Sequence, residues 1–365
     1  MQSEKRKIRV LVVDDSAVMR KMIPSLLEQD GDLEVVATAI DGDFALNKID
    51  QLKPDVVTLD IDMPRMDGLT ALSHIVSKHA IPVIMLSSLT TRGAALTMKA
   101  LEIGAVDFIC KPKAIAQVGE MAGELVSKIK AAARHKMVPM SVTPAVRRTT
   151  ARKKPLAVPG LASGGIVAIG ASSGGPHALR YMLPRIPADF GAGIVIVQHM
   201  PESFTAMFAQ WLDEICEVEV REARDGDLIA PGIALIAPGN AHVKVRKRAN
   251  GGEVTVEKGS LVNGHMPSVD VLFKTVAEEY GNQAIALLMT GMGSDGAEGL
   301  GLIKQSGGRT VAQDKDSCAI FGMPRVAIEK GYAEKVVPLA DLASYLISAV
   351  GKADCLEVTG YGERR

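Results

Sequence analysis

The chain has 365 residues, which is long for one hydrophobic core and favours two domains of ordinary size. Hydrophobic residues make up 47% of it, and 42 Lys and Arg balance 42 Asp and Glu. This composition argues against general disorder and against a broad positive field for nucleic acid. The four cysteines are far apart and form no CxxC pair, which argues against a zinc knuckle or a disulfide framework.

The start of the chain does not read as a targeting segment. The apolar run IRVLVV, residues 8–13, is halted at once by Asp14 and Asp15, so it is too short for the core of a signal peptide. No apolar run reaches the length that spans a bilayer. We therefore expect a soluble cytoplasmic protein without membrane insertion.

Residues 1–128 alternate short apolar runs with helix-like stretches. The runs predict strands at 9–13, 33–39, 55–59, 82–86 and 106–110, and the stretches predict helices at 44–52, 70–79 and 97–105. Five such repeats predict an α/β domain with a parallel sheet and helices on both faces.

Residues 129–163 are predicted to be a linker. No acidic residue occurs between Glu124 and Asp189, and the interval contains prolines and a run of basic residues. We assign no binding role to those basic residues, which are Arg147, Arg148, Arg152, Lys153 and Lys154.

Residues 164–355 repeat the α/β pattern and are followed by a tail, residues 356–365. Strands are predicted at 166–170, 193–198, 233–237, 284–291 and 310–313, with a hairpin over 244–259 that turns at Asn250 to Gly252. The fold class is therefore two doubly wound parallel-sheet domains, one flavodoxin-like and one Rossmann-like. In such sheets, sites form at the carboxyl ends of the strands.

Polar groups follow four predicted strands of the first domain. Asp14 and Asp15 follow the first strand, Asp60 the third, Ser87 the fourth and Lys111 the fifth. One aspartate after a strand is usually a turn or cap residue, but three carboxylates on one edge suit a hard cation such as Mg²⁺. Asp60 is then a candidate phosphoryl acceptor, with Lys111 as countercharge and Ser87 as a movable hydroxyl. A pure metal site is the alternative, and it gives Lys111 no purpose.

These residues lie in the motifs VLVVDDS, LDIDMPRMDG, MLSS and CKP, which resemble the receiver domain of two-component response regulators over residues 8–128. The resemblance implies that Asp60 is phosphorylated and that Asp14 and Asp15 hold Mg²⁺ with it. It also implies that Ser87 and Lys111 form the switch pair and that Phe108 is an aromatic that repacks on phosphorylation. A receiver regulates something else, so the activity is expected in the second domain.

The stretch GASSG, residues 170–174, fits the GxSxG elbow that raises a serine hydroxyl above a sheet. It also resembles the glycine loop of short-chain dehydrogenases, which need a tyrosine followed four residues later by a lysine. None of the five tyrosines here has a lysine at that spacing, which argues against a dehydrogenase.

A serine nucleophile needs a base and an orienting acid. His199 closes the strand at 193–198 and Asp295 follows the strand at 284–291, so one sheet edge can gather both beside Ser172. His199 would take the proton of Ser172, and Asp295 would fix the imidazole tautomer. A backbone N–H of the GMGSDG loop, at Met292, could face the oxyanion.

The other candidate histidines fit less well. His177 lies within the helix after the elbow, whereas His242 and His265 lie in predicted loops. For His242 and His265, lining a pocket and lying in a solvated loop both stay open.

The motifs IGASSGGP, VIVQHMP, APGNAHV, PSVDVLF, MTGMGSDGAEG and FGMP resemble the catalytic domain of the CheB family of chemotaxis protein-glutamate methylesterases, over residues 165–350. The resemblance implies Ser172 as nucleophile, His199 as base and Asp295 as acid, and no cofactor for the hydrolase. Ser173 stands where a threonine is frequent and keeps a supporting hydroxyl.

The activity implied is demethylation of glutamate methyl esters on chemoreceptors, with methanol released, and deamidation of receptor glutamines as a second reaction. The implied partners are methyl-accepting chemoreceptors as substrate and a chemotaxis histidine kinase as phosphodonor, with no nucleic acid. Because a receiver is fused to the hydrolase, we expect the unphosphorylated receiver to cover the edge that carries the triad, and phosphorylation of Asp60 to favour an open form.

Two other classes of protein remain possible at this point. One is a DNA-binding response regulator, and the other is a phosphate- or nucleotide-binding module built on the glycine turn.

Overall fold

The computed structural model describes residues 6–111, 119, 121–134, 165–248 and 251–357. The chain divides into two compact units, residues 1–142 and residues 143–365, and each unit is described by itself. No helix among the described residues combines the length and the apolar character needed to cross a bilayer.

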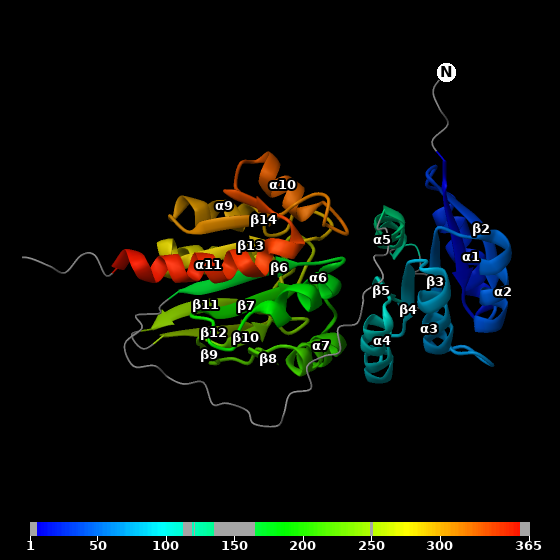
Figure 1. Cartoon of the computed structure of the whole chain (residues 1–365), viewed down its shortest axis with the longest axis horizontal. Helices are drawn as coiled ribbons and strands as arrows, with labels where there is room; N and C mark the ends of the chain where they lie inside the picture. The colour runs from blue at the N-terminus through cyan, green and yellow to red at the C-terminus, as the bar shows by residue number, and fades with distance from the viewer. Residues whose placement is uncertain (1–5, 112–118, 120, 135–164, 249–250, 358–365) are drawn as a thin grey trace, which may run out of the picture. The chain divides into compact units, whose positions relative to one another are not determined.

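The first unit is a five-stranded parallel sheet in the order β2-β1-β3-β4-β5 (Figure 1). Each of the five predicted strands is confirmed to within one residue at either end. Their bounds are β1 (Ile8–Val13), β2 (Leu33–Ala39), β3 (Val56–Asp60), β4 (Val83–Ser87) and β5 (Asp107–Cys110).

Among its described residues, five helices cover this sheet, with α1 and α5 in contact on one face and α2, α3 and α4 in succession on the other. They are α1 (Ala17–Leu27), α2 (Gly42–Leu52), α3 (Gly68–His79), α4 (Thr91–Ile103) and α5 (Ala122–Arg134). Helix α4 begins six residues before the predicted start at 97 because Thr90 caps it, its hydroxyl accepting the Gly93 N–H at 3.0 Å.

Gly68 brings α3 close to the end of β3. A Cβ built on Gly68 would lie 2.0 Å from the carbonyl oxygen of Asp60, and the Gly68 N–H donates to Ile61 O at 3.0 Å. Only a residue without a side chain permits this approach. The local sequence MDG therefore fixes the backbone beside Asp60.

The second unit contains a seven-stranded parallel sheet in the order β15-β14-β13-β6-β7-β10-β8. The five predicted strands are confirmed as β6 (Ile166–Ala171), β7 (Gly193–Gln198), β10 (Ile233–Ile236), β13 (Ala284–Leu288) and β14 (Arg309–Gln313). From β6 the chain first adds strands on the β7 side and then returns to add β13 on the other side. The carboxyl ends of β6, β7 and β13 therefore meet where the strand order reverses, which is where open α/β sheets bind ligands.

Two strands of this sheet were not predicted. They are β8 (Glu219–Glu222) and β15 (Lys335–Val337), and both lie at its edges. Edge strands are commonly short and charged, so they lack the apolar run that identifies a buried strand. The prediction for β13 was also too long, since the Thr290 N–H donates to the Gln313 side chain instead of continuing the ladder.

The predicted hairpin is confirmed as β11 (His242–Arg248) paired antiparallel with β12 (Gly251–Glu257), and β9 (Leu228–Ile229) completes a separate three-stranded sheet. Asn250 of the predicted turn lies outside the described residues. This antiparallel sheet is an addition to the Rossmann-like prediction.

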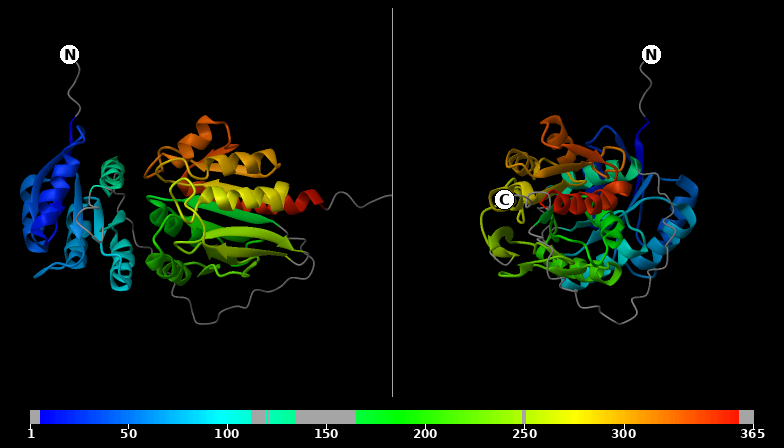
Figure 2. Two further views of the ribbon diagram at one scale, coloured as in Figure 1. Left: turned by 180° about the vertical axis from the view of Figure 1, so that it is seen from behind. Right: turned by 60° about the vertical axis from the view of Figure 1, so that its left-hand side comes forward.

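Helix α8 (Val269–Tyr280) packs against both β11 and β6, so it lies between the antiparallel and parallel sheets. Its buried residues Leu272, Phe273 and Val276 belong to the main core of this unit. Figure 2 shows α8, in yellow, on the face opposite to α11 (Leu339–Glu357) and α6 (Gly175–Met182). This packing holds the first turn of α8 at the carboxyl edge of the parallel sheet.

The remaining helices are α7 (Glu202–Ile215), α9 (Ala297–Gln305) and α10 (Met323–Glu329). Helix α5 continues to Arg134, so residues 129–134 of the predicted linker are helical, and residues 135–163 with their basic run lie outside the described residues. Helix α11 likewise runs to Glu357, two residues into the predicted tail.

Candidate functional site

The sheet register places Ser172 and His199 side by side. Ala171 of β6 pairs with Gln198 of β7, and Ser172 and His199 are the next residue of each strand. The His199 N–H donates to Ala171 O at 3.0 Å, and the Ser172 N–H donates to Thr290 O at 3.0 Å. Adjacent strands lie about 4.8 Å apart, so the two side chains leave neighbouring backbone positions.

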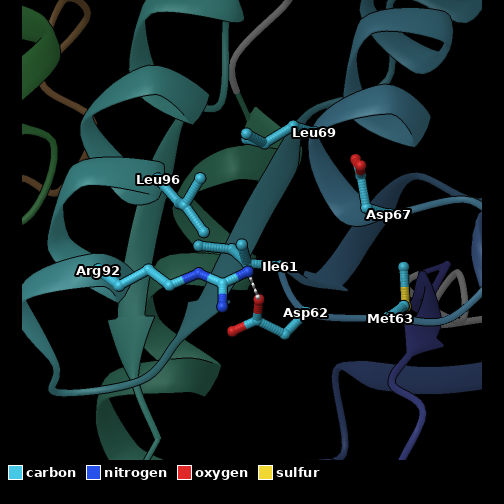
Figure 3. Close-up of a pocket in the computed structure, with 7 residues that line it drawn as sticks. All are labelled: Ile61, Asp62, Met63, Asp67, Leu69, Arg92 and Leu96. Atoms are coloured by element: carbon cyan, nitrogen blue, oxygen red, sulfur yellow. Dashed lines mark ion pairs between the residues drawn. The ribbon is translucent and has the colours of Figure 1, made fainter.

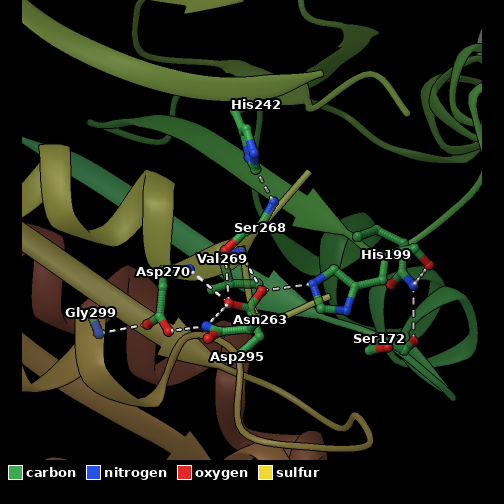
Figure 4. A network of polar contacts seen from close by, with 10 residues as sticks. Ser172, His199, His242, Asn263, Ser268, Val269, Asp270, Asp295 and Gly299 are labelled. Atoms are coloured by element: carbon green, nitrogen blue, oxygen red, sulfur yellow. Dashed lines mark hydrogen bonds and ion pairs between the residues drawn. The ribbon is translucent and has the colours of Figure 1, made fainter. Parts of the chain in front are cut away.

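Asp295 contacts His199 as the sequence predicted. His199 Nε2 lies 2.9 Å from Asp295 Oδ2, and the side chains are only 8% and 1% exposed. In Figure 4, Ser172 lies on the side of the His199 ring away from Asp295. The structure thus brings all three predicted residues to the same edge.

Four further donors reach the Asp295 carboxylate, all from the start of α8 and the loop before it. They are Val269 N at 2.6 Å, Ser268 Oγ at 2.8 Å, Asn263 Nδ2 at 2.8 Å and Asp270 N at 3.3 Å. Burial raises the pKa of Asp295, but the hydrogen bonds from His199, Asn263 and Ser268 outweigh burial and hold that pKa below its usual range. Asp295 therefore stays ionised opposite the imidazole.

The serine–imidazole hydrogen bond is not formed. Because Nε2 faces Asp295, the other ring nitrogen, Nδ1, is the one available to Ser172. His199 Nδ1 is buried and makes no hydrogen bond to any part of the chain that the structure describes. Catalytic hydrogen bonds often tighten only when substrate binds.

Gln198, the last residue of β7, links this strand to the turn that contains Ser172. It is buried, and its Nε2 donates to Ser172 O at 2.9 Å and to His199 O at 3.1 Å. A Cβ on Gly175 would lie 2.0 Å from Gln198 Oε1, so the glycine leaves room for this side chain. Gln198 was not predicted as a site residue, although a polar residue ending the apolar run GIVIVQ is a usable signal.

The loop after β13 lies against the serine. A Cβ built on Gly291 would be 2.8 Å from the Cβ of Ser172, so the backbone passes close to the serine side chain. Met292 follows directly, and its oxyanion role stays a prediction. Ser173 is buried, and its carbonyl accepts a hydrogen bond from Thr290 Oγ1 at 2.9 Å.

The three other candidate histidines differ in their burial and contacts. His177 is exposed on α6. His242 is buried at the start of β11, where Nδ1 accepts the Ser268 N–H at 3.2 Å and Nε2 lies 2.9 Å from Ser260 O, so the solvated-loop alternative is wrong for it. His265 is half-buried, and its ring stacks on His199 with 3.8 Å between ring centroids and 15° between planes.

In the first unit, the predicted carboxylates and lysine form one cluster. Carboxylate oxygens of Asp14, Asp15 and Asp60 lie within 4.8 Å of one another. Lys111 Nζ lies 2.8 Å from Asp14 Oδ2 and 2.7 Å from Asp60 Oδ2. Burial raises the pKa of Asp60 to about 6, with the Asp14 charge adding to the rise and Lys111 opposing it. Three crowded carboxylates whose charge one lysine does not balance fit a divalent cation.

Ser87 is buried and its hydroxyl is bonded to α4. Ser87 Oγ donates to Gly93 O at 3.2 Å and accepts from Thr97 Oγ1 at 2.6 Å. Phe108 is also buried, with Lys128 Nζ 5.4 Å from its ring centroid. Both switch candidates therefore contact helices that could transmit a change.

A surface pocket lies beside the loop that follows Asp60. Arg92 and Asp62 face each other across it at 3.8 Å (Figure 3). Its lining consists of Ile61, Asp62, Met63, Asp67, Leu69, Arg92 and Leu96. These lining residues all lie within the first unit and include none of Ser172, His199 and Asp295.

Each of the two units matches a known protein family. Residues 10–122 match the family model of the response regulator receiver domain, and residues 167–346 match that of CheB methylesterase. A Koribacter versatilis protein named protein-glutamate methylesterase/protein-glutamine glutaminase 2 is 50% identical over 93% of this chain and 95% of its own length. A Pyrococcus horikoshii protein named protein-glutamate methylesterase/protein-glutamine glutaminase is 43% identical over 94% of each.

Among solved structures, the Thermotoga maritima CheB methylesterase catalytic domain is 41% identical, with a TM-score of 0.50. The match covers 51% of this chain and 99% of that one. The fold and the site thus define a receiver domain joined to a second α/β parallel-sheet domain, in which Ser172, His199 and Asp295 lie at one edge of the sheet. The chain belongs to the CheB methylesterase family.

Proposed function

We propose that this protein is a phosphorylation-regulated serine hydrolase that removes methyl esters from glutamates of chemoreceptors and deamidates receptor glutamines. The names of the relatives support the substrate. The observation that carries the chemistry is the 2.9 Å contact between His199 and Asp295, made directly beside Ser172.

The reaction begins when Ser172 Oγ attacks the ester carbonyl carbon while its proton passes to His199 Nδ1. The tetrahedral species collapses as the C–O bond to the methoxy group breaks, and the imidazolium returns the proton to release methanol. Water then attacks the acyl carbon and gives a proton to His199. The bond from that carbon to Ser172 Oγ breaks, the imidazolium returns the proton to Oγ, and a glutamate carboxylate is released. For a glutamine, the leaving group is ammonia.

The supporting residues act at defined points of this reaction. Asp295 stabilises the imidazolium, because it stays ionised and buried. A backbone N–H at Met292 would donate to the oxyanion, and removal of one such donor typically costs about 3 kcal/mol. The hydrolase domain requires no cofactor in this scheme.

The receiver would be phosphorylated on Asp60 by a chemotaxis histidine kinase in the cytoplasm. Asp14, Asp15 and Asp60 would hold Mg²⁺, which when bound neutralises the charge of the carboxylates and the phosphoryl group. Lys111 would pair with the phosphoryl group. Ser87 would exchange its contacts to α4 for the new oxygens, and Phe108 would repack.

The test is release of volatile label from a methyl-labelled receptor, with and without acetyl phosphate and Mg²⁺. The wild type should release methanol faster with the phosphodonor, Asp60→Asn should lose that response, and Ser172→Ala should release none. Retained turnover by Ser172→Ala would refute the nucleophile. An unchanged phosphodonor response in Asp60→Asn would refute the regulation.

A further inference from the structure

The segment Val262–His265 forms a tight two-residue turn at the triad, which we call the NG turn. Val262 N donates to His265 O at 3.1 Å, and His265 N donates to Val262 O at 2.9 Å. Asn263 and Gly264 both have positive φ, 53° and 80°. Two-residue hairpin turns with positive φ at both central positions strongly favour Asn-Gly, so the sequence VNGH encodes this geometry locally.

Asn263 positions Asp295, the acid of the triad, by a hydrogen bond to its carboxylate. Its Nδ2 donates to Asp295 Oδ1 at 2.8 Å and to Asp270 Oδ2 at 2.6 Å (Figure 4). The other oxygen of Asp270 accepts the Gly299 N–H at 2.6 Å, so Asp270 is itself fixed at the start of α9. A neutral amide therefore bridges two carboxylates that repel each other.

His265 positions His199, the base of the triad, by stacking on the face of its imidazole ring. The hydrogen bond between His199 Nε2 and Asp295 fixes the position of one ring atom, but it does not fix the plane of the ring. The χ2 torsion of histidine is broadly distributed, so the side chain alone does not fix this plane either. A second ring at 3.8 Å and nearly parallel opposes that rotation. With the edge and the face both held, Nδ1 keeps its direction toward Ser172.

We infer that the NG turn is a positioning element of the hydrolase: Asn263 fixes the Asp295 carboxylate and His265 fixes the plane of the His199 imidazole. The inference rests on the proposed role of the triad. Asn263 acts through the Asp295 carboxylate and His265 through the His199 ring, so both are positioning residues. Both residues belong to one short turn, which two backbone hydrogen bonds between Val262 and His265 close.

The kinetic test uses the full-length protein with His265→Ala, His265→Phe and Asn263→Ala, and the exposed Asn282→Ala as control. His265→Ala and Asn263→Ala should lower kcat about 10- to 100-fold with KM nearly unchanged, as expected when a base is misplaced. His265→Phe should recover most of kcat, because a flat ring can still stack. Thermal unfolding checks that each variant is folded.

A kcat of His265→Ala within twofold of the control would overturn the role of His265. Equal losses in His265→Phe and His265→Ala would overturn the stacking explanation, since the ring nitrogens would then matter. A kcat of Asn263→Ala within twofold of the control would overturn the role of Asn263.

A second readout does not depend on turnover. In a Ser172→Ala background, the proton shared by His199 and Asp295 should give a far-downfield ¹H resonance. Asn263→Ala and His265→Ala should broaden or abolish it, whereas Asn282→Ala should leave it intact. An intact resonance in both NG-turn variants would overturn the inference, whether or not the proposed hydrolase activity is correct.

Discussion

His199 Nε2 lies 2.9 Å from Asp295 Oδ2, and the same carboxylate oxygen accepts the Val269 N–H at the first residue of α8. The acid is thus held by a helix N-terminus, where a negative charge is stabilised. Helix α8 is in turn held between the two sheets of the unit. The orientation of the base therefore depends on the packing of the whole domain.

The first prediction concerns the identity of the acid. Asp295→Asn keeps the shape of the side chain but removes the charge that stabilises the imidazolium, and it allows the wrong tautomer. We expect methanol release to fall by about 10⁴-fold, as in other triads. Single-turnover kinetics on a labelled receptor would measure this, and a loss under tenfold would contradict the role of Asp295.

The second prediction concerns pH. The pKa of Asp295 is lowered on folding, so its ionisation stabilises the fold above the unfolded value of 3.8, and that contribution is lost as the pH falls below it. Trp211, the only tryptophan, lies buried in the same unit and reports its unfolding. Between pH 7 and pH 3, the wild type should lose at least about 1 kcal/mol more unfolding free energy than Asp295→Asn. If the unfolding free energies of the two proteins change equally with pH, the lowered pKa of Asp295 is contradicted.

The third prediction concerns Gln198. Gln198→Leu fills the same space but removes the side-chain donor to the carbonyls of Ser172 and His199. Ser172 O keeps the Gly175 N–H at 2.8 Å, so the larger loss falls on His199 O. We expect a loss of about 1–3 kcal/mol in stability and a clear fall in kcat. Gln305→Leu, on an exposed position of α9, is the matched control in urea unfolding followed by Trp211. If both variants behave alike, Gln198 does not anchor the turn.

The fourth prediction concerns Lys111. Lys111→Met removes the cation that lies against Asp14 and Asp60, leaving buried carboxylates unpaired. Without Mg²⁺, the receiver should lose about 3 kcal/mol at pH 8. The loss should shrink below pH 6, where Asp60 takes up a proton, and Mg²⁺ should restore much of it. Calorimetry of both proteins would test this, and a pH-independent difference would count against it.

The strands that carry the site could be predicted because they are apolar runs followed by polar residues. Asp60, Ser172 and His199 each stand at such a boundary, and parallel strands bring these boundaries to one edge. The edge strands β8 and β15 could not be predicted in this way. Strand β15 has only three residues, and β8 has four residues, of which three are charged.

The missed parts of the site depend on contacts rather than on pattern. His242 was expected in a loop, yet it is buried because β11 begins at it and Ser268 donates to it. The NG turn has a readable signature, but only the fold shows that it lies against His199 and Asp295. That His199 Nδ1 has no hydrogen-bond partner among the described residues is likewise a detail of side-chain position that the sequence does not encode.

The central claim is that Ser172 becomes covalently acylated through His199. Rapid acid quenching of the enzyme with a methylated receptor, followed by digestion and mass spectrometry, tests it most directly. We predict an acyl adduct on the peptide containing Ser172, formed together with methanol and absent from His199→Ala. Methanol release at the wild-type rate with no adduct at Ser172, or with the adduct on another residue, would contradict the claim.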